Sequence, residues 1–280
     1  MNNQNYPCLW FDGQAKAAAE FYCAIFLNSR ILSHNPLVTM WELCGQKFMG
    51  LDGGSKFKPN PSLSFFVTCE TNEEVDAIWE KLKQDAKIMM NLDKYDWSEY
   101  YGFLEDKFGI SWQVFKGNYS EVNQQIVPCF LFTDHRFGKA NEAVNFYTSV
   151  FSNSKIDGIL YYSEEEMHQK QIVKHAQFAL DGTVFMAMDG AGEHNFSFNE
   201  AISFVINCDT QEQIDYFWNS FTKDGGEESM CGWCKDKFGF SWQIVPYILG
   251  ELMSEPERGQ RVMAAFLKMR KFDIEKLVNA

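Results

Sequence analysis

The sequence predicts an α+β protein made of two tandem modules, each with two strand–helix–three-strand units that form a curved mixed sheet around a cleft, followed by C-terminal helices. The first observation behind this prediction is a repeated string. DKFGISWQV at Asp106–Val114 returns as DKFGFSWQI at Asp236–Ile244. Such self-similarity indicates an internal duplication. The second observation is that hydrophobic periodicity gives the same order of strands and helices before each copy. We place the modules at residues 1–118 and 126–250, a linker at 119–125 and a helical tail at 251–280.

Composition narrows the class of partner and the compartment. Of the 280 residues, 46% are hydrophobic, and the net charge of −13 disfavours nucleic acid as a partner. No apolar run reaches the roughly 20 residues of a membrane span, and the start of the chain lacks the features of a signal peptide. The eight cysteines are scattered over strand-like and helix-like stretches, which is typical of reduced thiols. We therefore expect a cytoplasmic protein that binds neither membranes nor nucleic acid.

The first half of the first module has one helix among its strands. The apolar segment Pro7–Phe11 predicts a buried strand, and Gln14–Phe26 predicts a helix because its apolar residues recur at helical spacing. A tight turn is expected at Gly45-Gln46. The three strands after the helix are expected at Arg30–Ser33, Leu37–Cys44 and Lys47–Leu51.

The second half of that module repeats the order. Ser62–Cys69 alternates as a strand, and Thr71 with Glu74 has the spacing of a capping box at the start of a helix. Further strands are expected near residues 87–90, 100–104 and 110–115.

The second module follows the same plan, and then the tail begins. Pro128-Cys129 corresponds to Pro7-Cys8, and Cys208–Trp218 corresponds to Cys69–Trp79. The loops after the first strands, DGQ and TDHRFGK, differ in length and charge, so we expect two unequal clefts. In the tail, Ser254–Glu257 has a capping-box spacing, and Asp273 is expected to start a last short helix. We expect the tail to pack against one module.

Several long motifs carry a family resemblance. PCLWFDGQAKAAAEFYCAIFLNSRI, CDTQEQIDYFW and CGWCKDKFGFSWQIVP resemble the PhnB-like branch of the vicinal oxygen chelate superfamily, also called the glyoxalase/bleomycin-resistance/dioxygenase fold. The branch is labelled 3-demethylubiquinone-9 3-methyltransferase, and the resemblance covers Tyr6–Ala280. It implies clefts lined by curved sheets, with helices outside and with exchange of elements between modules. In metal-dependent members, His or Glu ligands lie on four cleft-facing strands, the last being a Glu beyond a DxxG turn.

The candidate site residues follow from the position of the last metal ligand in the family pattern and from the alternation of side chains along strands. The last-ligand position holds Gln113 and Gln243, and alternation places Ser111 and Ser241 on the same faces as these glutamines. Each glutamine could contact a ligand, or it could be a structural hydrogen-bonding residue. His175 matches a strand position in the family pattern, and Trp10 is an aromatic residue that could stack on a planar ligand.

The residue types at the expected ligand positions give little indication of metal binding or of redox chemistry. A neutral amide is a weak ligand for transition metals, and the other expected ligand positions carry no histidine. Cys231 and Cys234 form a C-x-x-C motif, but their flanks predict strand and turn, whereas redox motifs of this kind open a helix. No glycine-rich turn of the kind that cradles a nucleotide-like cofactor is present, so the residues do not indicate S-adenosylmethionine. We expect no cofactor, with a divalent metal as the alternative.

Three functions remain open at this point. The first is a PhnB-like protein that binds a small, fairly apolar molecule in a cleft without a metal. The second is a metal-dependent isomerase, dioxygenase or transferase, including the methyltransferase that the label suggests. The third is an interaction module that has no ligand. A homodimer is compatible with each of them.

Overall fold

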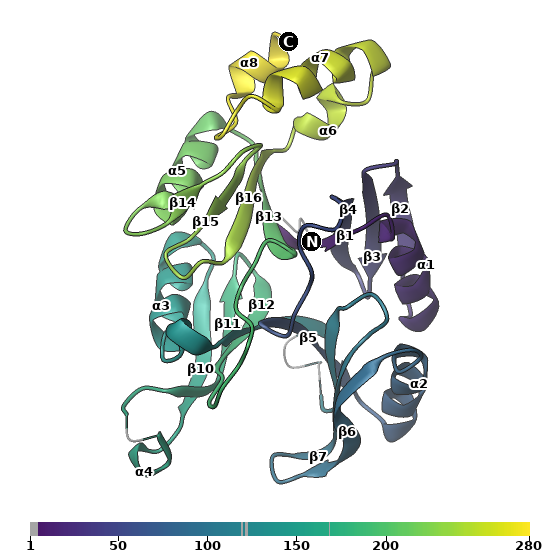
Figure 1. Ribbon diagram of the computed structural model, residues 1–280, viewed down its shortest axis with the longest axis vertical. Coiled ribbons are helices and arrows are strands. Elements are labelled where there is room, and N and C mark those ends of the chain that lie inside the picture. Colours follow the sequence, from purple (N-terminus) through teal and green to yellow (C-terminus); the bar gives the residue numbers. More distant parts are fainter. Residues whose placement is uncertain (1–4, 119, 121–122, 168) are drawn as a thin grey trace. The chain divides into compact units, whose positions relative to one another are not determined.

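The computed structural model describes residues 5–118, 120, 123–167 and 169–280 (Figure 1). Residues 119, 121 and 122 of the predicted linker lie outside this description, as does His168. The chain divides into a terminal unit of residues 1–8 and 202–280 and a central unit of residues 9–201. No helix among the described residues is long and apolar enough to cross a membrane.

The central unit contains an eight-stranded sheet, here called the β5–β12 sheet, in the spatial order β10-β11-β12-β9-β5-β8-β7-β6. The pairs β5–β8 and β9–β12 are parallel and the others antiparallel, so the sheet is mixed as predicted. The four strands β5, β6, β7 and β8 come from the first predicted module, and the four strands β9, β10, β11 and β12 come from the second. This arrangement is the expected exchange of elements. The strands are β5 (Leu63–Cys69), β6 (Lys87–Tyr95), β7 (Ser98–Glu105), β8 (Ser111–Lys116), β9 (Ile126–Phe132), β10 (Lys155–Tyr161), β11 (Val173–Leu180) and β12 (Thr183–Asp189).

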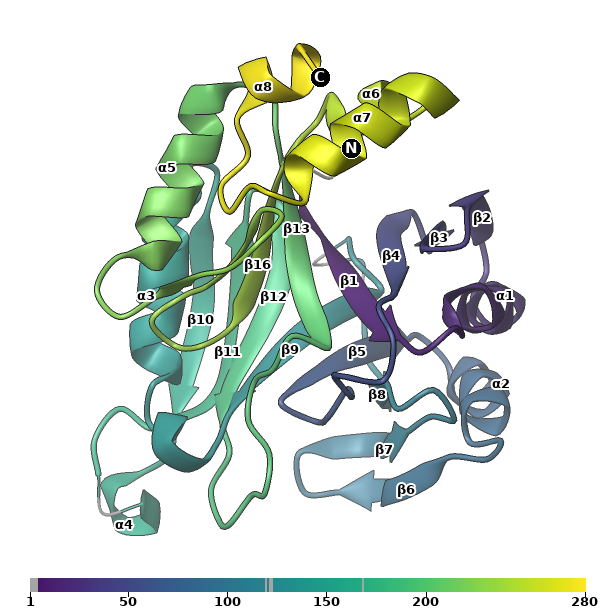
Figure 2. The same ribbon diagram turned by 45° about the horizontal axis from the view of Figure 1, so that its top comes forward.

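Helices cover one face of this sheet. α2 packs over β7 and β8, and α3 lies along β10, β11 and β12 (Figures 1 and 2). Thr71 caps α2 as predicted, because its hydroxyl accepts a hydrogen bond from the Glu74 N–H at 3.2 Å. The helices of the central unit are α1 (Ala15–Ile25), α2 (Asn72–Leu82), α3 (Ala140–Val150), α4 (Glu164–Met167) and a 3₁₀ turn at Asp134–Arg136.

The first module also supplies β2 (Arg30–His34), β3 (Val38–Leu43) and β4 (Gln46–Asp52), paired as an antiparallel meander. The turn between β3 and β4 has Cys44 and Gly45 at its centre, one residue earlier than predicted. Both residues have positive φ, 50° and 80°. A two-residue hairpin turn requires this backbone at both positions, and only glycine adopts it without strain.

The repeated DKFG string folds as a turn held by its aspartate. The Asp106 carboxylate accepts hydrogen bonds from the backbone N–H groups of Phe108 and Ile110 at 2.8 and 3.0 Å. It also accepts from the Trp112 indole at 2.9 Å and from the Tyr22 hydroxyl at 2.8 Å. In the second copy, Asp236 makes the matching bonds to the backbone and to its own tryptophan within the terminal unit. The motif therefore recurs because one carboxylate shapes the turn before the last strand.

Side chains on β8 alternate between the helix side and the open side, as predicted. The Trp112 ring is fully buried against Tyr22 and Phe26, with ring centroids 5.3 and 5.4 Å apart. Tyr22 belongs to α1, and Phe26 directly follows it. Since neighbouring residues on a strand point to opposite faces, Gln113 projects away from the helices.

In the terminal unit the strands are ordered β14-β15-β16-β13-β1, with β1 continuing into the central unit. α5 packs on β15 and β16. The elements are β1 (Asn5–Phe11), β13 (Ile202–Cys208), α5 (Gln211–Thr222), β14 (Glu227–Glu228), β15 (Trp233–Lys235), β16 (Ser241–Pro246), α6 (Leu249–Leu252), α7 (Pro256–Phe266) and α8 (Ile274–Val278).

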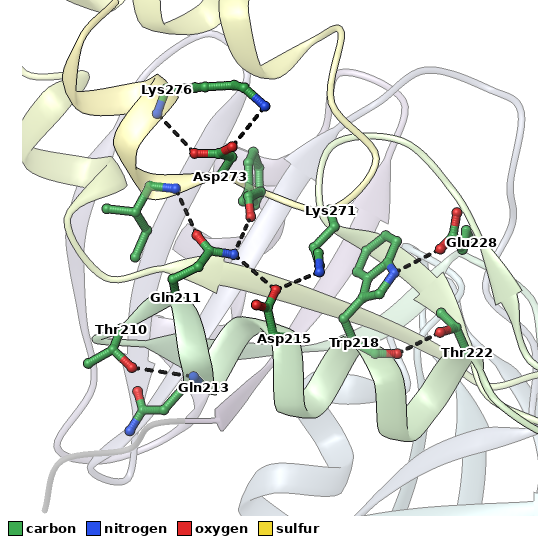
Figure 3. Close-up of polar contacts among 12 residues, drawn as sticks. Thr210, Gln211, Gln213, Asp215, Trp218, Thr222, Glu228, Lys271, Asp273 and Lys276 are labelled. Atoms are coloured by element: carbon green, nitrogen blue, oxygen red, sulfur yellow. Dashed lines mark hydrogen bonds and ion pairs between the residues drawn. The ribbon is translucent and has the colours of Figure 1, made fainter.

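Within the terminal unit the C-terminal tail packs onto α5, which belongs to the second predicted module, as expected of a tail that covers one module. The Gln211 side chain on α5 donates to the Phe272 carbonyl at 3.0 Å and accepts from the Ile274 N–H at 2.9 Å (Figure 3). Lys271 pairs with Asp215 at 2.5 Å (Figure 3). The last stretch of chain is therefore fixed to α5 by both backbone and side-chain contacts.

The two predicted helix starts in the tail have different outcomes. Asp273 caps α8 as predicted, by accepting from the Lys276 N–H at 3.0 Å. The capping box predicted for Ser254–Glu257 is wrong. Glu255 occupies the N-cap of α7 without a capping bond, and the Ser254 hydroxyl donates to the Glu251 carbonyl at 2.7 Å instead.

Candidate ligand-binding site

A cavity of about 1270 Å³ opens on the face of the β5–β12 sheet away from α2 and α3. Each of the eight strands contributes to its lining. Most of the lining is aromatic, aliphatic or thioether, while the charged members are all exposed. The apolar members are Pro61, Phe66, Met90, Trp97, Tyr101, Phe103, Phe115, Leu131, Leu160, Tyr162, Met186 and Met188, and the charged members are Asp96, Glu99, Lys116 and Lys174.

The sheet curves strongly around this cavity. Phe66 lies on β5 and His175 on β11, with β9 and β12 between them. Three strand spacings of about 4.8 Å would separate these strands by roughly 14 Å in a flat sheet. Their rings nevertheless meet edge to face with centroids 6.4 Å apart. Because the two side chains converge, the open face is concave, as the fold class predicts.

Gln113 lies at the floor of the cavity and is 7% exposed. Its carboxamide is held on both sides. The Tyr101 hydroxyl donates to Gln113 Oε1, and Gln113 Nε2 donates to Ser64 Oγ at 2.8 Å. Two neighbouring strands, β7 and β5, therefore fix the orientation of the amide.

Cys129 joins the same floor from β9, where it lies directly opposite Ser64 in the antiparallel pair. Its Sγ donates weakly to the Phe130 carbonyl at 3.8 Å. Complete burial raises the pKa of the Cys129 thiol, and burial likewise raises the pKa of Tyr101. Both groups are therefore protonated at neutral pH, so the floor carries hydrogen-bonding groups without a fixed charge.

His175 lines another wall of the cavity. Burial lowers the pKa of its imidazole, because the charged form loses hydration there. Its ring is therefore neutral at pH 7 and presents one donor and one acceptor nitrogen. Gln113 and His175, two of the residues predicted from the sequence, thus contribute to one cavity.

The other predicted site residues lie elsewhere. Ser111 is fully buried and does not line this cavity, and its hydroxyl has no hydrogen-bond partner within the described part of the chain. The indole of Trp10 donates to the Gly54 carbonyl at 2.6 Å and packs edge-on against Phe57. Trp10 is likewise outside the lining of this cavity.

The terminal unit holds a second copy of the glutamine cluster. Gln243 Nε2 donates to Ser203 Oγ at 2.9 Å, matching Gln113 and Ser64. Cys8 lies within hydrogen-bonding reach of both Gln243 and Ser203, and burial raises its thiol pKa to about 12. Ser241 is buried, and its hydroxyl finds no partner among the described residues. The register pairs Trp233 with Gln243 and Phe103 with Gln113, which puts Cys231 in the place of Tyr101.

The donor set of the cavity does not fit a catalytic metal of the superfamily type. The cleft-facing floor offers an amide, a hydroxyl and a thiol in Gln113, Ser64 and Cys129. The amide oxygen already accepts from Tyr101, and burial keeps the thiol protonated, whereas the ligand form is the thiolate. Over the described residues, no group of three or more His, Cys, Asp or Glu side chains could hold a metal ion.

Sequence reasoning missed three side chains of the floor. Ser64 and Cys129 each have a counterpart in the other module, Ser203 in the second and Cys8 in the first, so the duplication contained a signal for both. Tyr101 carried no such signal, because Cys231 replaces it in the second copy. Only the strand register brings its hydroxyl to Gln113.

Comparisons with known proteins show the family and the fold of the chain. A family model described as 3-demethylubiquinone-9 3-methyltransferase matches residues 3–115 and 124–245. A Bacillus cereus structure carrying that description and the name PhnB is 37% identical, over 39% of this chain and 96% of that chain, with a TM-score of 0.38. A Pseudomonas aeruginosa protein is 18% identical over 40% of this chain and 95% of its own, with a TM-score of 0.36.

Longer matches come from glyoxalase I of Zea mays, which is similar to 86% of this chain and is itself covered to 91%. The identity is 10% and the TM-score 0.54, so this likeness shows the tandem fold alone. The comparison with curated proteins gave no match.

Proposed function

The chain belongs to the 3-demethylubiquinone-9 3-methyltransferase family, and from this premise and the geometry of the cavity we propose that it binds a small, planar, largely apolar molecule on the concave face of the β5–β12 sheet. The observation that carries the proposal is the cavity of about 1270 Å³ with an aromatic and thioether lining and a few buried polar groups. Small-molecule sites typically combine an apolar wall with a small number of placed polar groups.

The aromatic side chains of the lining favour a planar ligand. Trp97 is 66% exposed and stacks on Tyr95, with ring centroids 5.1 Å apart and planes 25° apart. The rings of Trp97 and Tyr101 meet edge to face, with centroids 6.2 Å apart. Such faces gain contact area against a flat molecule at little cost in side-chain entropy.

Titration with N-phenyl-1-naphthylamine, a neutral planar dye that fluoresces in apolar surroundings, tests this proposal. We expect saturable binding, weakened at least tenfold by Met186→Trp, which places a bulkier ring in the apolar wall of the cavity. Met230 is 43% exposed outside the cavity, so Met230→Trp is the matched control. Absence of dye binding, or equal binding in both variants, would show that this cavity is not the binding site.

Methyl transfer is the second candidate function, and the description of the matching family model favours it. Its chemistry requires a methyl donor. Calorimetric titration with S-adenosylmethionine tests this candidate directly. Saturable binding would support transfer, and no heat of binding would leave the small-molecule role as the better account.

A further inference from the structure

The hydrogen bonds of Gln113 determine which of its groups remain available. A tyrosine hydroxyl has one hydrogen, and Tyr101 gives it to Gln113 Oε1. An amide nitrogen has two hydrogens, and Gln113 gives one of them to Ser64 Oγ at 2.8 Å. The amide oxygen thus already has a donor on one of its two acceptor sites, while one N–H is left without a partner among the described residues.

Ser64 also keeps a donor. Its oxygen accepts from Gln113, and its own hydroxyl hydrogen has no acceptor among the residues that the structure describes. Both side chains line the cavity, and both are more than nine-tenths buried, with Gln113 7% and Ser64 2% exposed. Two hydrogen-bond donors therefore lie side by side at the floor without partners, and a buried donor in that state costs free energy until a ligand satisfies it.

The residues around these two donors determine whether a charged or a neutral ligand group fits them. The charged lining residues Asp96, Glu99, Lys116 and Lys174 are all exposed. Cys129, next to Ser64, is a protonated thiol that donates to a backbone carbonyl. A ligand carboxylate at the floor would therefore be buried without a counter-charge, which is costly.

We propose that Gln113 and Ser64 recognise a neutral carbonyl oxygen, so that the ligands of this cavity are uncharged aromatic ketones or related carbonyl compounds. This inference rests on the binding function proposed above. In this site a pair of neutral donors contacts the ligand oxygen, and Tyr101 is a positioning residue that orients the amide.

The test compares 9-fluorenone with fluorene, two planar tricyclic molecules of nearly the same shape that differ in one carbonyl group. Each compound is titrated in competition with N-phenyl-1-naphthylamine bound to the protein. We expect fluorenone to bind roughly tenfold more tightly, the effect of one or two hydrogen bonds to buried donors. Its carbonyl stretching band should shift to lower frequency in the infrared spectrum of the complex.

Two variants of the protein test the role of the free N–H of Gln113 and the free hydroxyl hydrogen of Ser64. In Gln113→Glu the carboxylate accepts from both Tyr101 and Ser64, so no donor remains and the preference for fluorenone should disappear. The combined variant Ser64→Ala with Gln113→Met is the second test in case the buried charge impairs folding. Gln84 is exposed and outside the cavity, so Gln84→Met is the control and should keep the preference.

The outcomes separate the two proposals. If the dye binds the wild-type protein but fluorenone and fluorene compete equally, or the carbonyl band is unshifted, carbonyl recognition is wrong and the binding function stands. If the dye does not bind the wild-type protein, the binding function itself fails.

Discussion

The imidazole of His175 meets the ring of Phe66 edge to face at 6.4 Å, although two strands separate the strands that carry them. The contact is possible only because the β5–β12 sheet curls. It also buries the imidazole, and burial lowers the pKa of His175 below its usual 6.5.

The first prediction concerns stability against pH. Between pH 6.5 and the lowered pKa of the folded state, the unfolded chain binds a proton at His175 that the folded protein does not bind. The contribution of this residue is therefore complete above pH 6.5 and is lost as the pH falls toward the lowered pKa. Urea unfolding of the wild type and of His175→Gln between pH 8 and 5 should show a smaller loss in the variant. His34→Gln, at an exposed strand position, is the control. A wild-type-to-variant difference that is independent of pH would contradict this.

The second prediction concerns the DKFG turn. In Asp106→Asn, one amide N–H must face a donor, either the Trp112 indole or the Tyr22 hydroxyl. We expect a loss of about 2–4 kcal/mol in the free energy of unfolding, because buried donors lose their acceptor. Asp85 is exposed and has a positive φ, which asparagine tolerates, so Asp85→Asn should change stability by less than about 0.5 kcal/mol. Similar losses in the two variants would argue against the structural role of Asp106.

The third prediction concerns Tyr101 as a positioning residue. Tyr101→Phe leaves Gln113 Oε1 buried without its donor, so we expect a loss of about 1–2 kcal/mol in unfolding free energy. The fluorenone-to-fluorene preference should also fall severalfold, because the amide can then rotate. Tyr95→Phe removes an exposed hydroxyl that donates to the Asn91 carbonyl, and it should cost about 0.5 kcal/mol or less. An unchanged ligand preference in Tyr101→Phe would limit Tyr101 to a structural role.

The fourth prediction concerns the difference between the two glutamine clusters. Gln113 has Tyr101 as a partner, whereas Cys231 occupies the matching place near Gln243. Dye titration of Gln113→Ala and Gln243→Ala should therefore give unequal losses of affinity, larger for Gln113. Identical losses would show that the two clusters are equivalent.

The fifth prediction concerns the docking of the tail. Gly232 has a φ of +78°, and a Cβ there would come within 2.5 Å of the Phe272 ring and 2.6 Å of the Ile244 carbonyl. We expect Gly232→Ala to destabilise the protein by about 2 kcal/mol or more, since backbone strain and a clash combine. A Cβ at Gly250 meets nothing within 4 Å, so Gly250→Ala should be neutral or slightly stabilising. Thermal unfolding of the two variants gives the comparison.

Local patterns predicted the parts of the site that depend on one strand. The position of Gln113 on the open face followed from alternation along β8, with Trp112 on the helix side. The same alternation placed Ser111 with Gln113, but it could not show that the cavity ends before Ser111. The sequence also could not show that Trp10 lies outside the lining of this cavity, where its indole donates to the Gly54 carbonyl.

The sequence by itself determined the duplication, the order of strands and helices, and the face on which each glutamine lies, because these follow from repeats and from a two-residue period along single strands. Only the tertiary structure decided which strands of the two modules share one sheet, that this sheet curls until Phe66 and His175 touch, and that Tyr101 and Ser64 occupy two sides of the Gln113 amide. Those facts depend on register and curvature between segments far apart in the chain, and no local pattern encodes either one.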